Sequence, residues 1–425
     1  MATTERPRLR FRALRKSFVK ASPAQNPKDS LVSVASEAGV LSEDVSTSII
    51  LPKEQLSVLT PVVGPTLNLH VTKVAVTPPK PGEVVVRIAW TGLCGSDPSF
   101  CVGPQPGFAS HNHIAGHEGI GHIVTSHDPS LLNKPVAARY LTYSCQECEF
   151  CLRGLPESCP RQLAFPKDLN GTFQHYITVP QHSVIQLPDY VFARDSPIRP
   201  SMYAAALCSG SAALKALRAA QLRPQAVIVV LGIAGSIGHL VGLMAKHIYG
   251  AKVIGVDVES KAGERMVKSG DVCARFLPAP KHPEQEKSFQ QSILKLCEDL
   301  RGHKSVLIGV DSAIVCANRV SGYNNLTSYV CDGASIIIVG SPSDGNTVSF
   351  PISDVLTRQI RIEGSLMGGR QEMLQCLDWI RTGLIKPYVT EIAFDDIPHY
   401  MKNFKTLGNT GKIVARIGGM PKNNS

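Results

Sequence analysis

A glycine-rich loop between a buried strand and a helix constrains the fold of this chain more than any other feature. The apolar run Val227–Leu231 leads directly into Gly-Ile-Ala-Gly-Ser-Ile-Gly, and a helical pattern over 236–249 follows. Small residues at such a turn let the helix pack closely on the strand and let backbone N–H groups approach a pyrophosphate. The helix N-terminus adds a partial positive charge. A plain turn would show the same glycine pattern, so the loop alone is weak evidence.

A second strand pattern strengthens the dinucleotide interpretation. Residues 252–256 are predicted to form a strand that ends in Asp257, nineteen residues after Gly238. A carboxylate at this place accepts hydrogen bonds from the adenosine ribose and repels the extra phosphate of NADP, which favours NAD. The alternatives are a turn or capping role for Asp257 and a solvated surface position for Lys261. The candidate NAD-binding residues here are Gly232, Gly235, Ser236, Ile237, Gly238, Asp257 and Lys261.

Further strand patterns occur on both sides of this unit. Further strands are predicted over 305–310 and 334–339, and strands alternating with helices predict a doubly wound parallel sheet in an α/β protein. From residue 51 to about 208, short β-like runs are broken by turns, and the clearest strand covers 84–90. A hydrogen-bonding edge strand near Ser335–Val339 suggests dimerisation through the cofactor domain.

Residues 1–50 look like a basic extension that is either disordered or a targeting segment. Eight Lys and Arg stand against two acidic residues within 1–30, which explains most of the net charge of +10. No nucleic-acid-binding motif accompanies this charge, and no apolar run approaches the roughly 20 residues that span a bilayer. Partners among nucleic acids or membranes are therefore not expected.

Twelve cysteines without a secretory signal indicate a reducing compartment. We expect the cytoplasm. The mitochondrial matrix is the alternative, because Leu9, Phe11 and Leu14 could form an amphipathic helix opposite the arginines.

The spacing of four of these cysteines predicts a closed metal site. The pattern Cys-x2-Cys-x2-Cys-x7-Cys can place four thiolates around zinc with no open position, which is typical of a structural site. A disulfide pair or an iron–sulfur ligand set is a weaker alternative. The four residues are Cys145, Cys148, Cys151 and Cys159.

A second group of metal-ligand types is dispersed along the chain. Cys94 follows a predicted strand, His117 lies in a Gly-His-Glu-Gly motif, and Cys208 lies where the β-rich part gives way to the sheet. Two thiolates and one imidazole are the ligand set of a catalytic zinc with its fourth position open. Taken singly, each of these residues is more often a core cysteine or a satisfied histidine, and spacing alone does not unite them.

Four motifs occur in the order found in a known family. The cysteine loop, Gly116–Gly119, Gly-Thr-Phe-Gln-His-Tyr (171–176) and the loop at 232–238 make the chain from about Leu51 to Gly419 resemble zinc-containing medium-chain alcohol dehydrogenases, particularly the yeast-type enzymes. The resemblance implies a GroES-like, mostly-β catalytic domain over 51–208 and a Rossmann domain over 209–366. Residues 367–425 would return to the catalytic domain, and the protein would be a homodimer or homotetramer.

The resemblance also implies a role for individual residues. Cys94, His117 and Cys208 would bind the catalytic zinc, and Glu118 would be the glutamate that can approach the metal. Asp97 would orient the zinc histidine, and Ser96 would bind the substrate oxygen and begin the proton relay. Gly340 would meet the nicotinamide, and Lys412 would pair with the pyrophosphate.

Three departures from the family pattern bear on the reaction. Gly95 stands where a His or Arg often faces the pyrophosphate, as in sorbitol-type relatives. Ser99 replaces the relay histidine, so the proton would leave through a cofactor hydroxyl and water, or through His111 or His113. His113 looks more like a surface loop residue than a relay group. Gln105 and Tyr140 replace large tryptophans, which predicts a substrate bulkier than ethanol.

The sequence therefore predicts an enzyme with two zinc ions per chain that transfers a hydride between NAD(H) and an alcohol and its aldehyde or ketone. One alternative keeps the fold and both zincs but reduces a conjugated aldehyde, an iminium or a polyol-type substrate. The other is a non-catalytic, metal-stabilised scaffold, which the intact ligand set disfavours.

Overall fold

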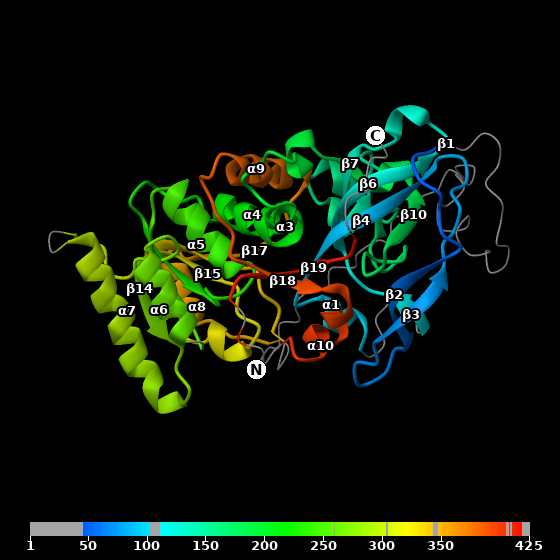
Figure 1. Cartoon of the computed structure of the whole chain (residues 1–425). Helices are drawn as coiled ribbons and strands as arrows, with labels where there is room; N and C mark the ends of the chain where they lie inside the picture. Colours follow the sequence, from blue (N-terminus) through cyan, green and yellow to red (C-terminus); the bar gives the residue numbers. More distant parts are fainter. Residues whose placement is uncertain are drawn as a thin grey trace, which may run out of the picture. The chain divides into compact units, whose positions relative to one another are not determined.

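The computed structural model describes residues 46–102, 111–258, 260–302, 305–342, 347–404, 408 and 410–418. The described residues belong to one compact unit, and Figure 1 shows their helices and strands. The expectations for residues 1–45 and Gln105 lie outside the described residues, as does the side chain of His111. Within the described ranges, no helix is both long enough and apolar enough to cross a membrane.

The β-rich part is built on an eight-stranded sheet whose strands come from both ends of the chain. Its main path runs β11-β7-β6-β4-β19-β18, with β1 paired to β6 and β10 paired to β4. Ser46 and Thr47, which fall within the predicted extension, form β1 of this sheet. The strands are β1 (Ser46–Thr47), β4 (Glu83–Leu93), β6 (Glu118–Ser126), β7 (Pro135–Arg139), β10 (Tyr176–Pro180), β11 (Ile185–Gln186), β18 (Val389–Ala393) and β19 (Lys412–Arg416).

Two smaller sheets and several short helices complete the β-rich part. A three-stranded sheet consists of β2 (Glu54–Val62), β3 (His70–Ala75) and β5 (His111–Ile114), and a two-stranded one of β8 (Leu141–Tyr143) and β9 (Leu163–Ala164). The helices are α1 (Asp97–Phe100), α2 (Glu149–Leu152), α3 (Pro200–Ala204), α9 (Arg370–Arg381) and α10 (Ile397–Lys402).

The second part is a six-stranded, all-parallel sheet in the order β14-β13-β12-β15-β16-β17, which is the doubly wound order that the sequence predicts. The order of successive strands reverses between β12 and β15, so the crevice for a dinucleotide lies at their carboxyl ends. The strands are β12 (Val227–Leu231), β13 (Lys252–Asp257), β14 (Arg275–Pro278), β15 (Val310–Val315), β16 (Val330–Ile338) and β17 (Arg361–Gly364).

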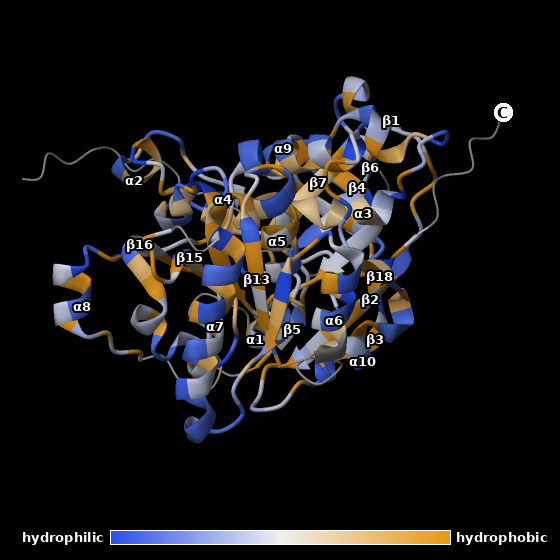
Figure 2. Cartoon of the chain, turned by 90° about the vertical axis from the view of Figure 1, so that its left-hand side faces the viewer, coloured by the Kyte–Doolittle hydropathy of each residue, from blue (hydrophilic) through white to orange (hydrophobic). Residues whose placement is uncertain are grey.

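Helices cover both faces of this parallel sheet. On one face α4 (Ser211–Ala220) and α5 (Gly238–His247) pack into a core that continues to α9. On the other face α7 (Glu286–Arg301) contacts β12, β13 and β14. Figure 2 shows β13 mostly orange and α7 largely blue, as expected for a buried strand and an amphipathic surface helix. The remaining helices are α6 (Ser260–Ser269) and α8 (Ile352–Thr357).

Two strand predictions need correction. The run at 305–310 is not a strand: Val306 and Ile308 are 92% and 75% exposed, and β15 begins only at Val310. Asp311 lies inside that strand because Arg301 and the backbone N–H of Val227 satisfy its carboxylate. Residues 335–339 do not form an edge, since β16 is paired on both sides; the outer strand is β17.

Candidate functional site

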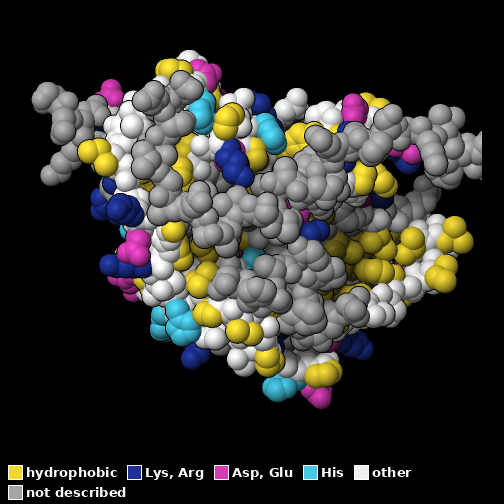
Figure 3. All heavy atoms as spheres, turned by 90° about the vertical axis from the view of Figure 1, so that its right-hand side faces the viewer, with side chains coloured by type: hydrophobic (Ala, Val, Ile, Leu, Met, Phe, Trp, Pro, Cys, Tyr) yellow, Lys and Arg dark blue, Asp and Glu magenta, His cyan; other side chains and the backbone are white. Residues whose placement is uncertain are grey.

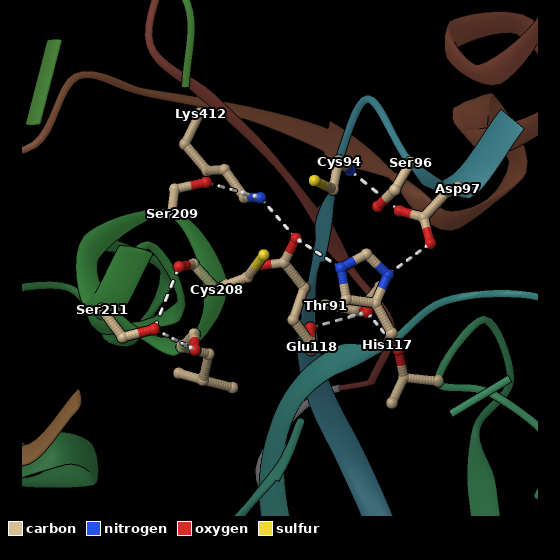
Figure 4. Close-up of polar contacts among 12 residues, drawn as sticks. Thr91, Cys94, Ser96, Asp97, His117, Glu118, Cys208, Ser209, Ser211 and Lys412 are labelled. Carbon is tan, nitrogen blue, oxygen red and sulfur yellow. Dashed lines mark hydrogen bonds and ion pairs between the residues drawn. The ribbon is translucent and has the colours of Figure 1, made fainter. Parts of the chain in front are cut away.

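The dispersed ligands converge on one point. Cys94 lies just beyond the end of β4, Glu118 is the first residue of β6, and His117 directly precedes it. One ligand atom each of Cys94, His117, Glu118 and Cys208 lies within 4.8 Å of all the others (Figure 4). The antiparallel pairing of β4 with β6 brings the first three together, because it places Thr91 opposite Gly119. Two thiols, an imidazole and a carboxylate suit zinc.

Asp97 fixes two of these ligands. Its Oδ1 lies 2.7 Å from Nδ1 of His117, and its Oδ2 accepts the backbone N–H of Cys94 at 2.8 Å. Asp97 is fully buried, so water does not compete for these bonds. With Nδ1 engaged, Nε2 of His117 is left to face the metal position. Asp97 thus makes the contact that the sequence prediction requires of it.

The thiols of Cys94 and Cys208 form a hydrogen bond with each other. A hydrogen bond from Cys208 lowers the pKa of Cys94 well below its ordinary value, and the positive charge of Lys412 adds to this effect against burial. The same contact raises the pKa of Cys208. The thiolate is the form that binds metal. A metal ion at this point would therefore displace the proton that lies between the two sulfurs.

Lys412 does not lie where the sequence prediction put it. Its ammonium is fully buried and forms an ion pair with Glu118, and it also donates to Ser209 Oγ at 3.3 Å. The backbone at Gly411 does lie against the dinucleotide loop, since its N–H donates to Ala234 O at 2.9 Å. The side chain, however, points to the metal ligands instead of to the pyrophosphate position. Burial raises the pKa of Glu118 to about 7, although Lys412 opposes this.

A π-helical turn presents Cys208, and no pattern in the sequence predicts this turn. The turn covers Ala206–Gly210, and the N–H of Gly210 donates to Ala205 O at 2.8 Å. Ser211 Oγ donates to the carbonyl oxygens of Leu207 and Cys208, both at 3.0 Å. A π-turn displaces one residue from the helical register and is frequent at functional sites.

The cysteine loop forms a second, closed group. The four sulfurs of Cys145, Cys148, Cys151 and Cys159 lie within 4.8 Å of one another. The backbone N–H groups of Cys148 and Cys145 donate to the sulfurs of Cys145 and Cys159, at 3.3 and 3.4 Å. Despite opposing burial, such N–H donors lower the pKa of Cys145 to about 6. Thiolates stabilised in this way are suited to a structural zinc.

The glycine loop has the close contacts expected of a dinucleotide turn. A Cβ at Gly238 would lie 2.0 Å from Gly232 O, and Gly232 adopts a φ of +84°. Both oxygens of Asp257 accept backbone hydrogen bonds, from Ala234 and Val258, each at 2.8 Å. Asp257 therefore braces the loop from the end of the neighbouring strand. Ser236 and Ile237 precede α5, and the side chain of Lys261 lies outside the described residues.

Gly340 lies at the carboxyl edge of the same sheet. Its N–H donates to Val315 O at 2.9 Å, and a Cβ there would lie 2.2 Å from Ala317 O. This backbone follows β15 and β16 in the chain. It lies on the β15 side of the point where the order of the strands reverses. The position is consistent with the nicotinamide contact that the resemblance implies.

Aromatic rings surround the catalytic ligands on one side. Phe100 and Tyr140 stack with their centroids 5.9 Å apart, and each lies edge-on to His117, at 5.7 and 6.0 Å. Tyr140 was singled out from the sequence, whereas Phe100 was missed; its place in the turn of helix following Asp97 was the available signal. Neither ring belongs to the main hydrophobic cores of the described part.

The candidate proton carriers are arranged differently from the sequence prediction. Ser96 is half-buried beside Cys94, whereas Ser99 donates to Ser96 O at 2.6 Å. His113 is not a surface loop residue: it is 2% exposed in β5, and burial lowers its pKa to about 4. A histidine held neutral in this way does not readily take up a proton near neutral pH.

Two family models match the chain. The alcohol dehydrogenase GroES-like domain covers residues 80–189, and the zinc-binding dehydrogenase model covers 236–382. The chain belongs to the zinc-containing medium-chain alcohol dehydrogenase family. Members of this family are oxidoreductases that act on alcohols and use zinc and a nicotinamide cofactor. The chain is therefore an oxidoreductase of this class.

Curated relatives and solved structures agree with this assignment. An alcohol dehydrogenase of Geobacillus stearothermophilus is 27% identical over 341 residues, which cover 79% of this chain and 92% of that protein. Alcohol dehydrogenase 1 of Emericella nidulans is 27% identical over 347 residues, covering 81% and 92%. The structure of an NAD-dependent alcohol dehydrogenase has a TM-score of 0.71 at 21% identity, covering 85% and 100%. That of acetophenone reductase from Geotrichum candidum, in complex with NAD, has a TM-score of 0.68 at 20% identity, covering 86% and 98%.

Proposed function

We propose that this enzyme interconverts an alcohol larger than ethanol with its aldehyde or ketone, using NAD(H). The observation that carries the proposal is the convergence of Cys94, His117 and Cys208 beside Glu118. Two thiolates and an imidazole leave one tetrahedral position free for the substrate oxygen. When bound there, zinc supplies a Lewis acid that lowers the pKa of the alcohol, and NAD supplies the hydride acceptor.

The chain's own residues orient the ligands and move the proton. Asp97 holds His117 and the Cys94 backbone in place. Ser96 is the hydroxyl nearest in sequence to Cys94, and we assign it to accept the alcohol proton and pass it outward. Ser99 is bonded to the Ser96 carbonyl and His113 is kept neutral, so neither is suited to take the proton on from Ser96; a hydroxyl of the bound cofactor, with water, would offer the remaining route. Lys412 balances the charge of Glu118.

The cofactor assignment rests on Asp257. Its carboxylate lies at the end of β13 and is anchored by two backbone N–H groups, so it cannot swing away from an incoming phosphate. A fixed negative charge at this place repels the 2′-phosphate of NADP. NAD is therefore the proposed cofactor, with Gly232, Gly235, Ser236, Ile237 and Gly238 at the pyrophosphate.

A second zinc is proposed at Cys145, Cys148, Cys151 and Cys159. The four sulfurs offer a complete tetrahedral set, so this metal has a structural role.

The substrate assignment rests on Phe100 and Tyr140. Two partly buried rings next to His117 offer an apolar wall that small alcohols such as ethanol would leave uncovered. The structural relative from Geotrichum candidum is called an acetophenone reductase, which supports an aryl substrate for this fold. On the face in Figure 3, the Lys and Arg side chains that are drawn in colour lie among Asp and Glu and form no continuous stripe.

We also propose a homodimer or homotetramer that pairs through β17, one of the two outer strands of the parallel sheet. Ile352 and Leu356 on the adjacent α8 are exposed, as expected of an interface. The domain limits 51–208, 209–366 and 367–425 remain proposals. We further propose that the protein is cytoplasmic, with the mitochondrial matrix as the alternative. The location of a fluorescent protein fused to residues 1–50 tests this proposal.

The decisive experiment is a panel of primary, secondary and aryl alcohols and their carbonyls, assayed with NAD and with NADP. Cys94→Ala and Ser96→Ala should lose turnover, whereas Cys331→Ala, a buried cysteine outside both metal groups, should keep it. Full turnover in the first two variants would refute the dehydrogenase assignment. Reduction of a C=C bond in product analysis would favour the conjugated-aldehyde alternative. Loss of preference for larger alcohols in Phe100→Ala, by up to about tenfold, would support the aromatic wall.

A further inference from the structure

Among the residues that the structure describes, Arg139 is a buried cation without a carboxylate partner. It is the last residue of β7, directly before Tyr140, and only 6% of it is exposed. One guanidinium nitrogen donates to the carbonyl of Gly368, and Nε is buried without a hydrogen-bond partner in the described part of the chain. An arginine stays protonated in proteins, so a full positive charge is held away from water.

The acidic groups around Arg139 are committed elsewhere. Glu157 pairs with Lys215 at 3.8 Å, and Glu372 pairs with Arg218. Burial lowers the pKa of Arg139, and the negative charge that opposes this most is that of Cys208. The backbone agrees, since β7 packs against the turn that carries Cys208.

A continuous set of contacts leads from Arg139 to Cys208. Gly368 belongs to the segment that returns to the β-rich part, and it touches the start of α4: a Cβ there would lie 2.1 Å from Ser211 O. Ser211 in turn donates to the carbonyl oxygens of Leu207 and Cys208. By holding Gly368, Arg139 holds the segment that packs on the π-helical turn.

The charges of the site point the same way. Four groups are negative when the site is loaded: the thiolates of Cys94 and Cys208 and the carboxylates of Asp97 and Glu118. Cys208 is partly buried and the other three are buried. A divalent metal and Lys412 together contribute three positive charges against these four negative ones. The site therefore keeps a net charge of −1. Arg139 supplies the missing positive charge. An unbalanced charge in a buried site is costly, so its removal should weaken the site.

We propose that Arg139 is a positioning residue of the catalytic metal site, whose charge stabilises the Cys208 thiolate and whose bond to Gly368 holds the Cys208 turn. The inference rests on the proposed function, because that function assigns Cys208 to the metal.

Cobalt binding to the full-length protein tests the proposal without a turnover assay. Arg139→Met should bind Co²⁺ at Cys94, His117 and Cys208 about 10- to 100-fold more weakly. Its thiolate-to-cobalt charge-transfer band should move to lower energy, because a nearby positive charge no longer stabilises the sulfur electrons. The metal at the four-cysteine loop should be unaffected and serves as the internal reference.

Two further variants separate charge from hydrogen bonding. Arg139→Lys keeps the charge and should restore most of the cobalt affinity and the band position. Arg139→Gln keeps a donor for Gly368 but no charge, and should behave like Arg139→Met. If Arg139→Met fails to fold, the comparison of the Lys and Gln variants decides. Arg301→Met is the matched control: Arg301 is also buried and donates to a carbonyl, Gly309 O at 2.9 Å, but lies in the parallel-sheet part.

The outcomes distinguish this inference from the function on which it rests. If the unmodified protein bound no metal at Cys94 and Cys208, the proposed function would fail and the inference with it. If cobalt bound but Arg139→Met changed neither affinity nor spectrum, only the inference would fail. Full restoration by Arg139→Gln would also overturn it, as would an equal spectral shift in Arg301→Met.

Discussion

The buried ion pair of Lys412 and Glu118 makes the sharpest prediction for stability. Both side chains are fully buried, and the only other polar contacts of this pair in the described residues are Ser209 at 3.3 Å and His117 at 3.9 Å. Lys412→Met leaves the buried carboxylate of Glu118 without the ammonium group that pairs with it. Breaking a buried pair from one side costs about 3–5 kcal/mol. We expect the free energy of unfolding to fall by this amount.

A double-mutant cycle isolates the pair. Glu118→Gln alone should also destabilise the protein, since it leaves the ammonium buried. The double variant removes both charges, so its loss should fall short of the sum of the single losses by about 2–3 kcal/mol. Urea unfolding at saturating zinc, followed by tryptophan fluorescence, measures all four proteins.

The exposed pair Arg153–Glu149, with side chains 66% and 83% exposed, is the control, and Arg153→Met should have no measurable effect. Additive losses in the cycle, or a loss below about 1 kcal/mol in Lys412→Met, would show that the pair is not held together as described.

Three further predictions concern the other sites. Cys148→Ser should reduce the metal content from two ions to one and lower the unfolding temperature, while the catalytic-site cobalt spectrum stays unchanged; loss of both ions would contradict two separate sites. Asp257→Asn should weaken NAD binding by about tenfold and narrow the preference over NADP, as measured by titration, because the braced loop and the repulsion are both lost. His239 is fully buried, and burial lowers its pKa to about 4 from 6.5. The stability that its neutral form contributes is complete above pH 6.5 and is lost as the pH falls to 4, by about 3 kcal/mol. His239→Gln should flatten this part of the stability profile; an unchanged profile would mean that another group titrates.

The parallel sheet and the four-cysteine loop could be predicted from the sequence, because residues close together in the chain determine both. The order strand, glycine loop, helix and strand at 227–257 specified the parallel sheet, and four cysteines within fifteen residues specified their own cluster. Cys94, His117 and Cys208 were different. Only the family resemblance united them, because their distance apart in space is set by the pairing of β4 with β6 and by the turn before α4.

What the sequence could not provide depends on long-range packing. Lys412 and Glu118 are 294 residues apart, so nothing in the local sequence of either residue indicates the other. The run Val306–Ile308 is apolar and was read as a strand, yet it is exposed. His113 follows two polar residues in sequence, but the pairing of β5 with β2 buries it. In each case the tertiary environment, and not the residue type, decides the outcome.

The position of β19 has a consequence for synthesis of the protein on the ribosome. This strand lies between β4 and β18 in the β-rich sheet, although it is the last strand of the described chain. The parallel sheet is contiguous and can assemble while the chain is still growing, whereas β4 must wait for its neighbour. Because Lys412 begins β19, Glu118 has no cation until translation is nearly finished. A chaperone that shields the exposed side of β4 during this interval would have the greatest effect on yield.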